Sequence, residues 1–513
     1  MSPTRRDAIA LIALPLLQAG WPGAPAAAAP PFSFEEVIAL ARARAGTPFV
    51  PSHKALPDQL GTIDYDGWRD IRFQPEAALL SGAFRMHMFH PGFLYKHPVD
   101  ISIVRNGKAE PVAYDPRLFD TGRNEFTPPL PADLGFAGFR LHFPLNRPGV
   151  MDEVIVFLGA SYFRVLSRDQ RYGLSARAIA IGSGEQDEEF PAFTNFWVED
   201  APAGAGSITV TAILDGPSLA GAYRFVIWPG AQTGVEVEAH LFPRRRIERL
   251  GIAPLTSMFF VSENDRRFLT EFRPEVHDSD GLLLHNGSGE WLWRPLRNPP
   301  GVRISSFMDS SPRGFGLMQR EREFGRYEDL EARYDLRPSY WVEPTGDWGK
   351  GRIELVELPA ADETEDNIVA FWVAADPVEE GETVVRSWRM RVLGSGGDLH
   401  AGGRVRATFQ GEARPAGARS PAPPHTRRFL IDFAGGELSY FLRQPDRIEL
   451  VPGVSRGRIE RHFLVPHPVI GGFRAGIDVA VEPGETTDIR VYLRSGERAL
   501  TETWTFPWTN ELG

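Results

Sequence analysis

Two segments of the sequence set carboxylates beside aromatic side chains. In the first, residues 272–295, Asp278 and Asp280 are separated by one serine, follow His277 and precede an aromatic run that begins at Trp291. Sugar rings present C–H faces that pack on aromatic rings, and two carboxyl groups can perform the acid and base steps of glycoside cleavage. This segment is therefore a candidate carbohydrate site. Taken alone, its pattern favours a plainer interpretation, in which the aspartates hydrogen-bond nearby backbone amides in Asx turns.

The second segment, residues 327–367, carries more acidic side chains, with tryptophans in or just after it. Glu363 and Asp366 are three residues apart, so on a turn they could share a field that raises one pKa and retains a proton near neutral pH. The alternative is a solvated acidic loop between two strands. The tryptophans of both segments are candidate sugar platforms and are equally well explained as core residues: Trp341, Trp348, Trp291 and Trp372.

Other reaction classes lack the residues that they need. The chain has no cysteine, which removes disulfides, thiol nucleophiles and cysteine metal ligands. The motifs G-x-S-x-G, G-x-x-x-x-G-K-S/T and H-E-x-x-H are missing. His90, His97 and His277 are better explained by packing or surface positions than by a metal site, so we expect neither a metal nor a cofactor. The formal net charge of -11 argues against nucleic-acid binding.

The elements that must position these residues are predicted to be mostly strands. With 51 glycines and 44 prolines, turn residues separate many short apolar runs. A helix is predicted at Ser33–Ala45, where Ser33 can cap and two glutamates follow in the first turn. Runs rich in valine, isoleucine and aromatic residues predict strands at 100–105, 153–158, 207–214, 234–242, 352–358 and 367–373.

Composition divides the chain into four parts. Arg5 and Arg6 precede an uncharged stretch through Ala29, which predicts a twin-arginine export signal over residues 1–29, with a membrane anchor as the alternative. Residues 30–393 form the predicted large domain, and the glycine-rich tract 394–403 is a linker. Residues 404–513 predict a small immunoglobulin-like β-sandwich with strands near 404–409, 427–433, 459–464, 476–481 and 487–493, and a mobile loop at 412–425.

Six motifs occur in order along the chain: Asp64-Tyr65-Asp66 with Arg72-Phe73, Phe89 to Phe93, Gly135 to Arg140, Phe157 to Arg164, Arg273 to Asp280 and Trp341 to Trp348. Together they resemble the glucans biosynthesis protein G/D family over nearly the whole mature chain, and the twin arginine is closer to the D branch. The resemblance implies a periplasmic protein that acts in the synthesis of osmoregulated periplasmic glucans, whose backbone is β-1,2-linked glucose. It also implies a large N-terminal β-sandwich with a long groove and a smaller C-terminal immunoglobulin-like β-sandwich.

The resemblance further implies inverting, endo-acting cleavage of β-1,2-glucan. Through the family's Glu-x-x-Asp-Asn segment, Asp366 matches the general acid. Through its His-Asp-Ser-Asp loop, Asp278 matches the general base, which acts through a chain of waters. Glu363 and Tyr334 match positions that bracket the acid and the proton relay, and Arg273 and Asp280 are predicted to bind the glucan.

Two alternatives to a hydrolase stay open. A transglycosylase would use the same acid and would cyclise or rearrange the glucan, with a sugar hydroxyl in place of water. A non-catalytic glucan-binding scaffold would dock on the membrane glucan synthase through its C-terminal domain. The expected partners are β-1,2-glucan and, in the second case, the synthase, while the chain itself is either a monomer or a homodimer.

Overall fold

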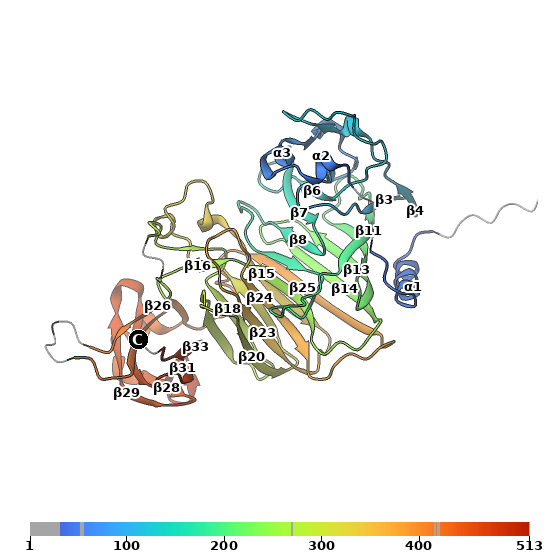
Figure 1. The fold of residues 1–513 in the computed structure, drawn as a ribbon. Coiled ribbons are helices and arrows are strands. Elements are labelled where there is room, and N and C mark those ends of the chain that lie inside the picture. Colours follow the sequence, from blue (N-terminus) through green and yellow to red (C-terminus); the bar gives the residue numbers. More distant parts are fainter. Residues whose placement is uncertain (1–30, 52–55, 268–269, 415–416, 418–420, 512–513) are drawn as a thin grey trace, which may run out of the picture.

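The computed structural model describes residues 31–51, 56–267, 270–414, 417 and 421–511. The predicted export signal, residues 1–29, and part of the predicted loop 412–425 lie outside this described part. Strands dominate the regular structure, so the prediction of a mostly β protein is confirmed. All the strands predicted from the sequence overlap observed ones. Figure 1 shows two packed layers of strands in the middle of the molecule and a smaller C-terminal unit, drawn in red, at one end.

The predicted helix is also confirmed. Helix α1 (Phe34–Ala45) is capped by Ser33, whose hydroxyl oxygen accepts a hydrogen bond from the Glu36 N–H (3.3 Å). Arg42 and Arg44 occupy its last turn, where the helix dipole favours cations. Its buried side chains pack on β12, β13 and β14: Phe34, Val37 and Ala41. The other α-helices of the described residues are short: α2 (Asp58–Gly61), α3 (Tyr65–Asp70) and α4 (Leu438–Phe441).

One layer is a ten-stranded sheet, which we call the first sheet. Its order is β2 (Arg85–Phe89), β6 (Gly138–Phe143), β7 (Asp152–Leu158), β8 (Tyr162–Val165), β9 (Ser175–Arg177), β15 (Leu250–Ser257), β24 (Ile368–Ala374), β23 (Lys350–Glu357) and β20 (Arg303–Ser310), with β10 (Ile179–Ile181) also on β15. Strands β15, β23 and β24 bury both faces. On the face turned away from the large core, side chains of β10, β23 and β24 form a small apolar cluster: Ala180, Val356, Val369, Phe371 and Val373.

The facing layer is a fifteen-stranded sheet, the second sheet. Its order is β28 (Glu449–Val454), β31 (Thr486–Ser495), β33 (Thr503–Thr509), β19 (Trp291–Pro295), β18 (Gly281–His285), β21 (Gly314–Met318), β22 (Ser339–Thr345), β25 (Val384–Leu393), β14 (Gly234–Pro243), β13 (Leu219–Trp228), β12 (Ile208–Asp215), β11 (Ala192–Glu199), β3 (Asp100–Arg105) and β4 (Lys108–Pro111). Strand β32 (Arg498–Ala499) pairs with β31.

Side chains from the two sheets meet in one large core. Buried tyrosines cross between the layers: the Tyr340 hydroxyl donates to the Val165 carbonyl (2.8 Å), and the Tyr223 hydroxyl donates to the Ala178 carbonyl (3.1 Å). These bonds satisfy polar atoms that would otherwise be costly to bury. The two sheets therefore form a β-sandwich.

The C-terminal unit shares a strand ladder with this sandwich. A four-stranded sheet, β26 (Arg404–Glu412), β27 (Thr426–Ala434), β30 (Gly472–Ala480) and β29 (Arg458–His467), packs against β28, β31 and β33. Strand β33 in turn pairs in parallel with β19, so the second sheet continues from one unit into the other. Two short ladders complete the fold: β1 (Arg72–Phe73) with β5 (Phe119–Asp120), and β16 (Phe259–Val261) with β17 (Val276–His277).

Candidate functional site

Hydrogen bonds connect the segments of the two candidate aspartates, Asp278 and Asp366, to two consecutive residues of the chain. Asp278 directly follows β17, and its backbone N–H donates to the Met258 carbonyl (2.8 Å). Asp366 precedes the buried Asn367, whose side chain bonds both backbone groups of Phe259. The Phe259 N–H donates to Asn367 Oδ1 (2.8 Å), and Asn367 Nδ2 donates to the Phe259 carbonyl (3.0 Å). Because Met258 and Phe259 are adjacent, backbone contacts hold both aspartates in one region.

Asp278 is a buried carboxylate with an arginine partner. Its Oδ1 accepts a hydrogen bond from Nη1 of Arg337. Burial raises the pKa of Asp278, Arg337 and Arg164 oppose that rise, and the charge of Asp366 adds to it. The influence of Asp366 on this pKa follows from the closeness of the two carboxyl groups, which is consistent with their shared anchor.

Tyr334 is a buried tyrosine whose hydroxyl is influenced by the charges of both Asp278 and Glu363. It opens the 3-10 turn Tyr334–Leu336, is buried, and carries the Arg337 guanidinium 4.0 Å from its ring centroid. Burial raises the pKa of the Tyr334 hydroxyl, Arg337 opposes this, and the charges of Glu363 and Asp278 add to it. The hydroxyl therefore stays protonated and can both donate and accept a hydrogen bond. Such a group can pass a proton between neighbours.

The guanidinium group of Arg273 contacts carboxylates from three segments of the chain. Its Nη1 donates to Asp329 Oδ2 (2.8 Å), its Nε and Nη2 donate to Glu271 (2.9 Å each), and Nη2 lies 2.6 Å from Glu363 Oε2. The pKa of Arg273 is raised, first by the hydrogen bond to Glu271 and further by Glu363 and Asp329. Glu363 thus has a cationic partner, and the loop before Asp366 is fixed against the segment that leads to the candidate base.

The buried side chain of His277 supports the segments that carry Asp278 and Tyr334. His277 Nδ1 faces Gln319 Oε1 (2.8 Å), and its Nε2 faces Glu275 Oε2 (3.1 Å). The Gln319 amide nitrogen donates to the carbonyls of His277 (2.8 Å) and Tyr334 (3.2 Å), which leaves its oxygen as the acceptor for the ring. Burial opposes the imidazolium charge, yet Glu275 raises the pKa of His277 overall. Gln319 thereby links the backbones that carry Asp278 and Tyr334.

An aromatic pocket is connected with Asp366 through one of its lining residues, Tyr162. It has a volume of about 320 Å³ and is lined by Tyr95, Tyr162 and Phe190 among others. Tyr162 lies on β8, where the guanidinium of Arg177 covers its ring at 4.8 Å from the centroid. Burial raises the pKa of Tyr162, Arg177 opposes this, and the charge of Asp366 adds to it. Aromatic faces beside a carboxyl group are the combination that a sugar-binding pocket needs.

The four tryptophans predicted as candidate platforms are placed in or against the apolar cores. Trp348 and Trp372 are buried in the core of the sandwich, with ring centroids 6.2 Å apart. Trp341 is buried where the C-terminal unit begins and stacks on the half-buried Trp291 at 5.5 Å. Trp291 also stacks on His285 at 4.1 Å. Their burial favours the core interpretation of these residues.

Asp280 faces the C-terminal unit, although it is only two residues from Asp278. Its Oδ2 accepts hydrogen bonds from the backbone N–H groups of Arg320 (3.0 Å) and Glu321 (3.1 Å). Burial raises its pKa, while His277 and Arg320 oppose the rise. Arg320 then forms a two-pronged ion pair with Glu502 (2.6 and 2.9 Å). In this structure Asp280 therefore holds the junction between the units.

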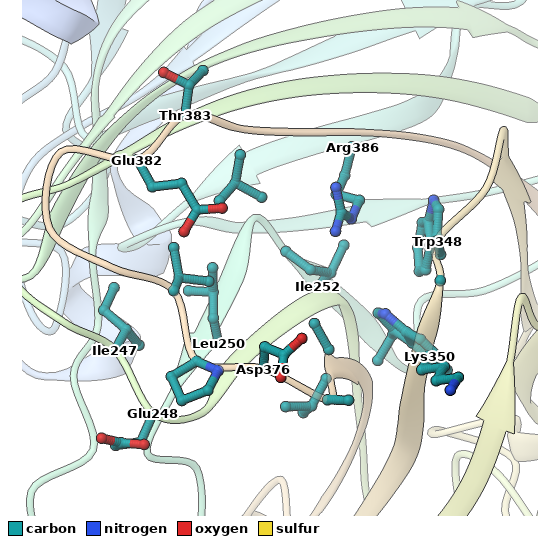
Figure 2. Close-up of a pocket in the computed structure, with 18 residues that line it drawn as sticks. Ile247, Glu248, Leu250, Ile252, Trp348, Lys350, Asp376, Glu382, Thr383 and Arg386 are labelled. Carbon is teal, nitrogen blue, oxygen red and sulfur yellow. The ribbon is translucent and has the colours of Figure 1, made fainter.

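A second pocket lies at the other end of β24 from Asp366. Figure 2 shows this pocket of about 290 Å³, with Ile252 and Trp348 along it and the charged side chains of Asp376, Glu382 and Arg386 around it. Strand β24 begins just after the candidate acid and ends beside this pocket. Seven strand residues span about 20 Å. The pocket is thus remote from the two aspartates.

Two residues of the site were not assigned from the sequence. Arg337 contacts Asp278, and the charge of Asp366 acts on the pKa of Tyr162. The signal for Arg337 was a cation three residues after Tyr334, and the signal for Tyr162 was its place in the motif Phe157 to Arg164. Residue type and spacing alone do not distinguish either one from an ordinary surface or core residue.

The described residues contain no cluster of three histidine, aspartate or glutamate side chains arranged to hold a metal ion. Within the same residues, no helix is both long and apolar enough to cross a membrane.

Comparison with known proteins identifies the family. The model of the family described as "Periplasmic glucan biosynthesis protein, MdoG" matches residues 32–508. The chain is 43% identical to the probable glucans biosynthesis protein D of Shewanella oneidensis, over 93% of this chain and 89% of the relative. It is 42% identical to glucans biosynthesis protein G of Rhodopseudomonas palustris (98% and 99% covered) and of Ralstonia nicotianae (94% and 97% covered). These matches confirm the resemblance found in the motifs, and the chain belongs to the MdoG family of periplasmic glucan biosynthesis proteins.

Proposed function

We propose that the protein is a periplasmic enzyme that cleaves β-1,2-glucan within the chain and inverts the configuration at the anomeric carbon. Family membership supports a role in periplasmic glucan biosynthesis. The enzymatic part of the proposal rests on the positions of two carboxyl groups. The segments that carry Asp278 and Asp366 are hydrogen-bonded to the adjacent residues Met258 and Phe259. Asp366 is exposed, whereas Asp278 is buried beside Arg337. An acid and a base in different surroundings are what glycoside cleavage requires.

Asp366 acts as the general acid. It is exposed just before β24, and its charge acts on Tyr162, which lines the aromatic pocket together with Tyr95 and Phe190. In the proposed complex, a glucan that enters this pocket presents a glycosidic oxygen to the Asp366 carboxyl group. The Asp366 proton moves to that oxygen as the bond to the anomeric carbon breaks. The leaving sugar departs as a neutral alcohol.

Asp278 acts as the general base. Its burial and its ion pair with Arg337 keep it from reaching the anomeric carbon directly, which argues against a covalent sugar intermediate. A water attacks the opposite face of the ring, and its proton passes through water and the Tyr334 hydroxyl to Asp278. The charge of Arg337 favours the ionised, proton-accepting form of Asp278.

Transfer to a sugar is the second candidate reaction. The aromatic pocket lined by Tyr162 can hold an acceptor glucose as well as a leaving one. If an acceptor hydroxyl takes the place of water, the same acid and base close or rearrange the glucan instead of hydrolysing it.

Product analysis on the purified protein tests the proposal. Linear β-1,2-glucan is digested and followed by NMR from the first minutes, and the products are separated by size and by ring closure. Inverting hydrolysis releases α-anomeric ends first, whereas β-anomeric ends would indicate retention and remove Asp278 as base. Ring products would favour transfer. Binding of glucan without any cleavage by the wild type would leave the scaffold role and overturn the enzymatic proposal.

A further inference from the structure

The pocket of Figure 2 lies at the end of the sandwich that is remote from the two aspartates, and both sheets contribute to it. Strand β15 of the first sheet provides Leu250 and Ile252, and strand β25 of the second sheet provides Val384 and Arg386. The volume of about 290 Å³ is at the small end of the range of about 300–1,000 Å³ that ligand pockets have. The pocket therefore suits a small ligand.

Most of the charged side chains that line this pocket are unpaired. Glu248 forms an ion pair with Arg246 (2.7 Å). The Arg386 guanidinium donates to the carbonyl of the adjacent Val385 (2.8 Å), and the Glu382 carboxylate accepts from the Glu379 backbone N–H (3.0 Å). Two cations and two anions of the lining have no ion-pair partner among the described residues: Lys350, Arg386, Asp376 and Glu382.

Arg386 and Glu382 influence each other across the pocket without contact. Burial lowers the pKa of Arg386 and the charge of Glu382 opposes this, yet no ion pair joins the two side chains. Figure 2 shows Arg386 and Trp348 on one side of the pocket, Glu382 on the other side, and Ile252 between them. Opposite charges that are held apart in one pocket can each bind the opposite charge of a zwitterion.

Backbone hydrogen bonds fix the segment that carries both acidic side chains, residues 375–383. Val378 exchanges two hydrogen bonds with Ile247 (2.9 and 3.0 Å), and the Gly381 N–H donates to the Pro243 carbonyl (3.1 Å). Binding costs less conformational entropy when the recognising groups are already held in place. The anionic side of the pocket is thus arranged before any ligand enters.

The uncharged part of the lining favours an aliphatic group over a sugar. Trp348 and Trp372 border the pocket but are 3% and 0% exposed, so neither offers an open ring face on which a sugar can stack. An aliphatic side chain needs no flat platform and can pack among the branched side chains of Leu250, Ile252 and Val384.

We propose that this pocket binds a free α-amino acid with an aliphatic side chain. The Arg386 guanidinium takes the carboxylate, as its planar fork suits two carboxylate oxygens, and Lys350 adds a second positive charge. Glu382 takes the ammonium group, and Asp376 adds a second negative charge. The side chain of the ligand packs on the apolar lining. This binding is separate from the proposed cleavage of glucan, whose residues lie at the other end of β24.

Calorimetry on the full-length mature protein tests the ligand class. L-leucine should bind, whereas leucinamide, which lacks the carboxylate, and N-acetyl-L-leucine, which lacks the ammonium group, should each bind about 10- to 100-fold more weakly. Each analogue loses one charge-assisted contact. The series uses the wild type, so its result does not depend on the folding of a variant. No binding of L-leucine at millimolar concentration, equal binding of the analogues, or tighter binding of a β-1,2-linked disaccharide would overturn the proposal.

Substitutions test the location of the site. Arg386→Gln and Glu382→Gln should each weaken the binding of L-leucine about 10- to 100-fold. The matched controls are Arg389→Gln, at an exposed arginine of the same strand, and Glu380→Gln, at an exposed glutamate of the same segment. Neither control residue lines the pocket, so both variants should bind L-leucine as the wild type does. Equal effects of the pocket and control substitutions would place the binding elsewhere and overturn the assignment.

Discussion

Asp278 and Asp366 have the same kind of side chain but lie in different surroundings. Asp278 is buried against Arg337, whereas Asp366 is exposed at the end of a loop. The guanidinium favours the ionised form of the first, and exposure lets the second touch a large substrate. The proposed division of roles between acid and base is based on these different surroundings of the two carboxyl groups.

The first prediction concerns the acid. Asp366→Asn keeps the size and hydrogen bonding of the side chain but cannot deliver a proton, so turnover of β-1,2-glucan should fall about 10²- to 10⁴-fold. Glucan binding, measured by calorimetry, should stay within a few-fold of the wild type. The neighbouring Glu365→Gln removes an equally exposed carboxylate and should leave turnover unchanged. Equal effects of the two substitutions would remove Asp366 from the mechanism.

The second prediction concerns pH dependence. Burial raises the pKa of Asp278 and Arg337 opposes that rise, so Arg337→Met should raise the pKa further and shift the acidic limb of the pH–activity profile to higher pH. The sign follows because the base must be ionised, and a higher pKa delays ionisation until the pH is higher. Arg337→Lys keeps the charge and should shift the limb less. An acidic limb that stays in place in Arg337→Met would show that another group is the base.

Part of the site could be predicted from the sequence and part could not. The charges of Asp278 and Glu363 both act on Tyr334, while the roles that the resemblance implies for these three residues stay predictions. The aromatic positions were harder, since a tryptophan in a sandwich core and one on a groove wall occur in the same alternating pattern. Trp372 and Tyr162 illustrate this: the first is buried in the core, and the second lines the aromatic pocket.

At the scale of elements, local sequence determined where strands occur but not which strands pair. Strand β3 at Asp100–Arg105 has the predicted bounds, because a valine- and isoleucine-rich run ends at turn residues. The pairing of β19 with β33 joins residues about two hundred positions apart, and no local pattern encodes such a contact. No local pattern shows either that one edge of β20 has no partner strand within the described residues.

The close approach of β23 and β24 gives the third prediction. A Cβ atom added at Gly351 would lie 2.2 Å from the Val373 carbonyl oxygen and 2.5 Å from the Trp372 ring. Gly351→Ala should therefore lower the free energy of unfolding by about 1–3 kcal/mol through overpacking. At Gly234 on β14 the nearest atom would be 3.8 Å away, so Gly234→Ala should have a much smaller effect. Urea unfolding of both variants measures the difference, and equal stability of the two would contradict the packing argument.

At the scale of the whole molecule, the two units are joined by more than a linker. The residues predicted as a linker, 394–403, lie between β25 and β26, and beside them the β19–β33 ladder and the Arg320–Glu502 ion pair cross the junction. Arg320 also stacks on Trp293 at 3.6 Å from the ring centroid. The C-terminal unit should therefore support the segment that carries Asp278 and Asp280.

The fourth prediction tests this junction. Glu502→Gln leaves Arg320 buried without a carboxylate partner, which should cost about 3–5 kcal/mol of stability. Because the ion pair spans the two units, the loss should appear in the unfolding of both, followed by the fluorescence of tryptophans in each. Glu497→Gln, an exposed substitution nearby, should change little. A loss confined to one transition would mean that the units unfold independently.

The parallel pairing of β33 with β19 also has a consequence for biosynthesis. Strand β19 emerges from the ribosome at residues 291–295, but its partner is made only at residues 503–509, about two hundred residues later. Until then one side of β19 has no partner, and a strand in that condition is prone to pair with other chains. Premature termination between β19 and β33 would leave that side open, so truncations that remove no more than β33 and the residues after it should still yield aggregates rather than a smaller working protein.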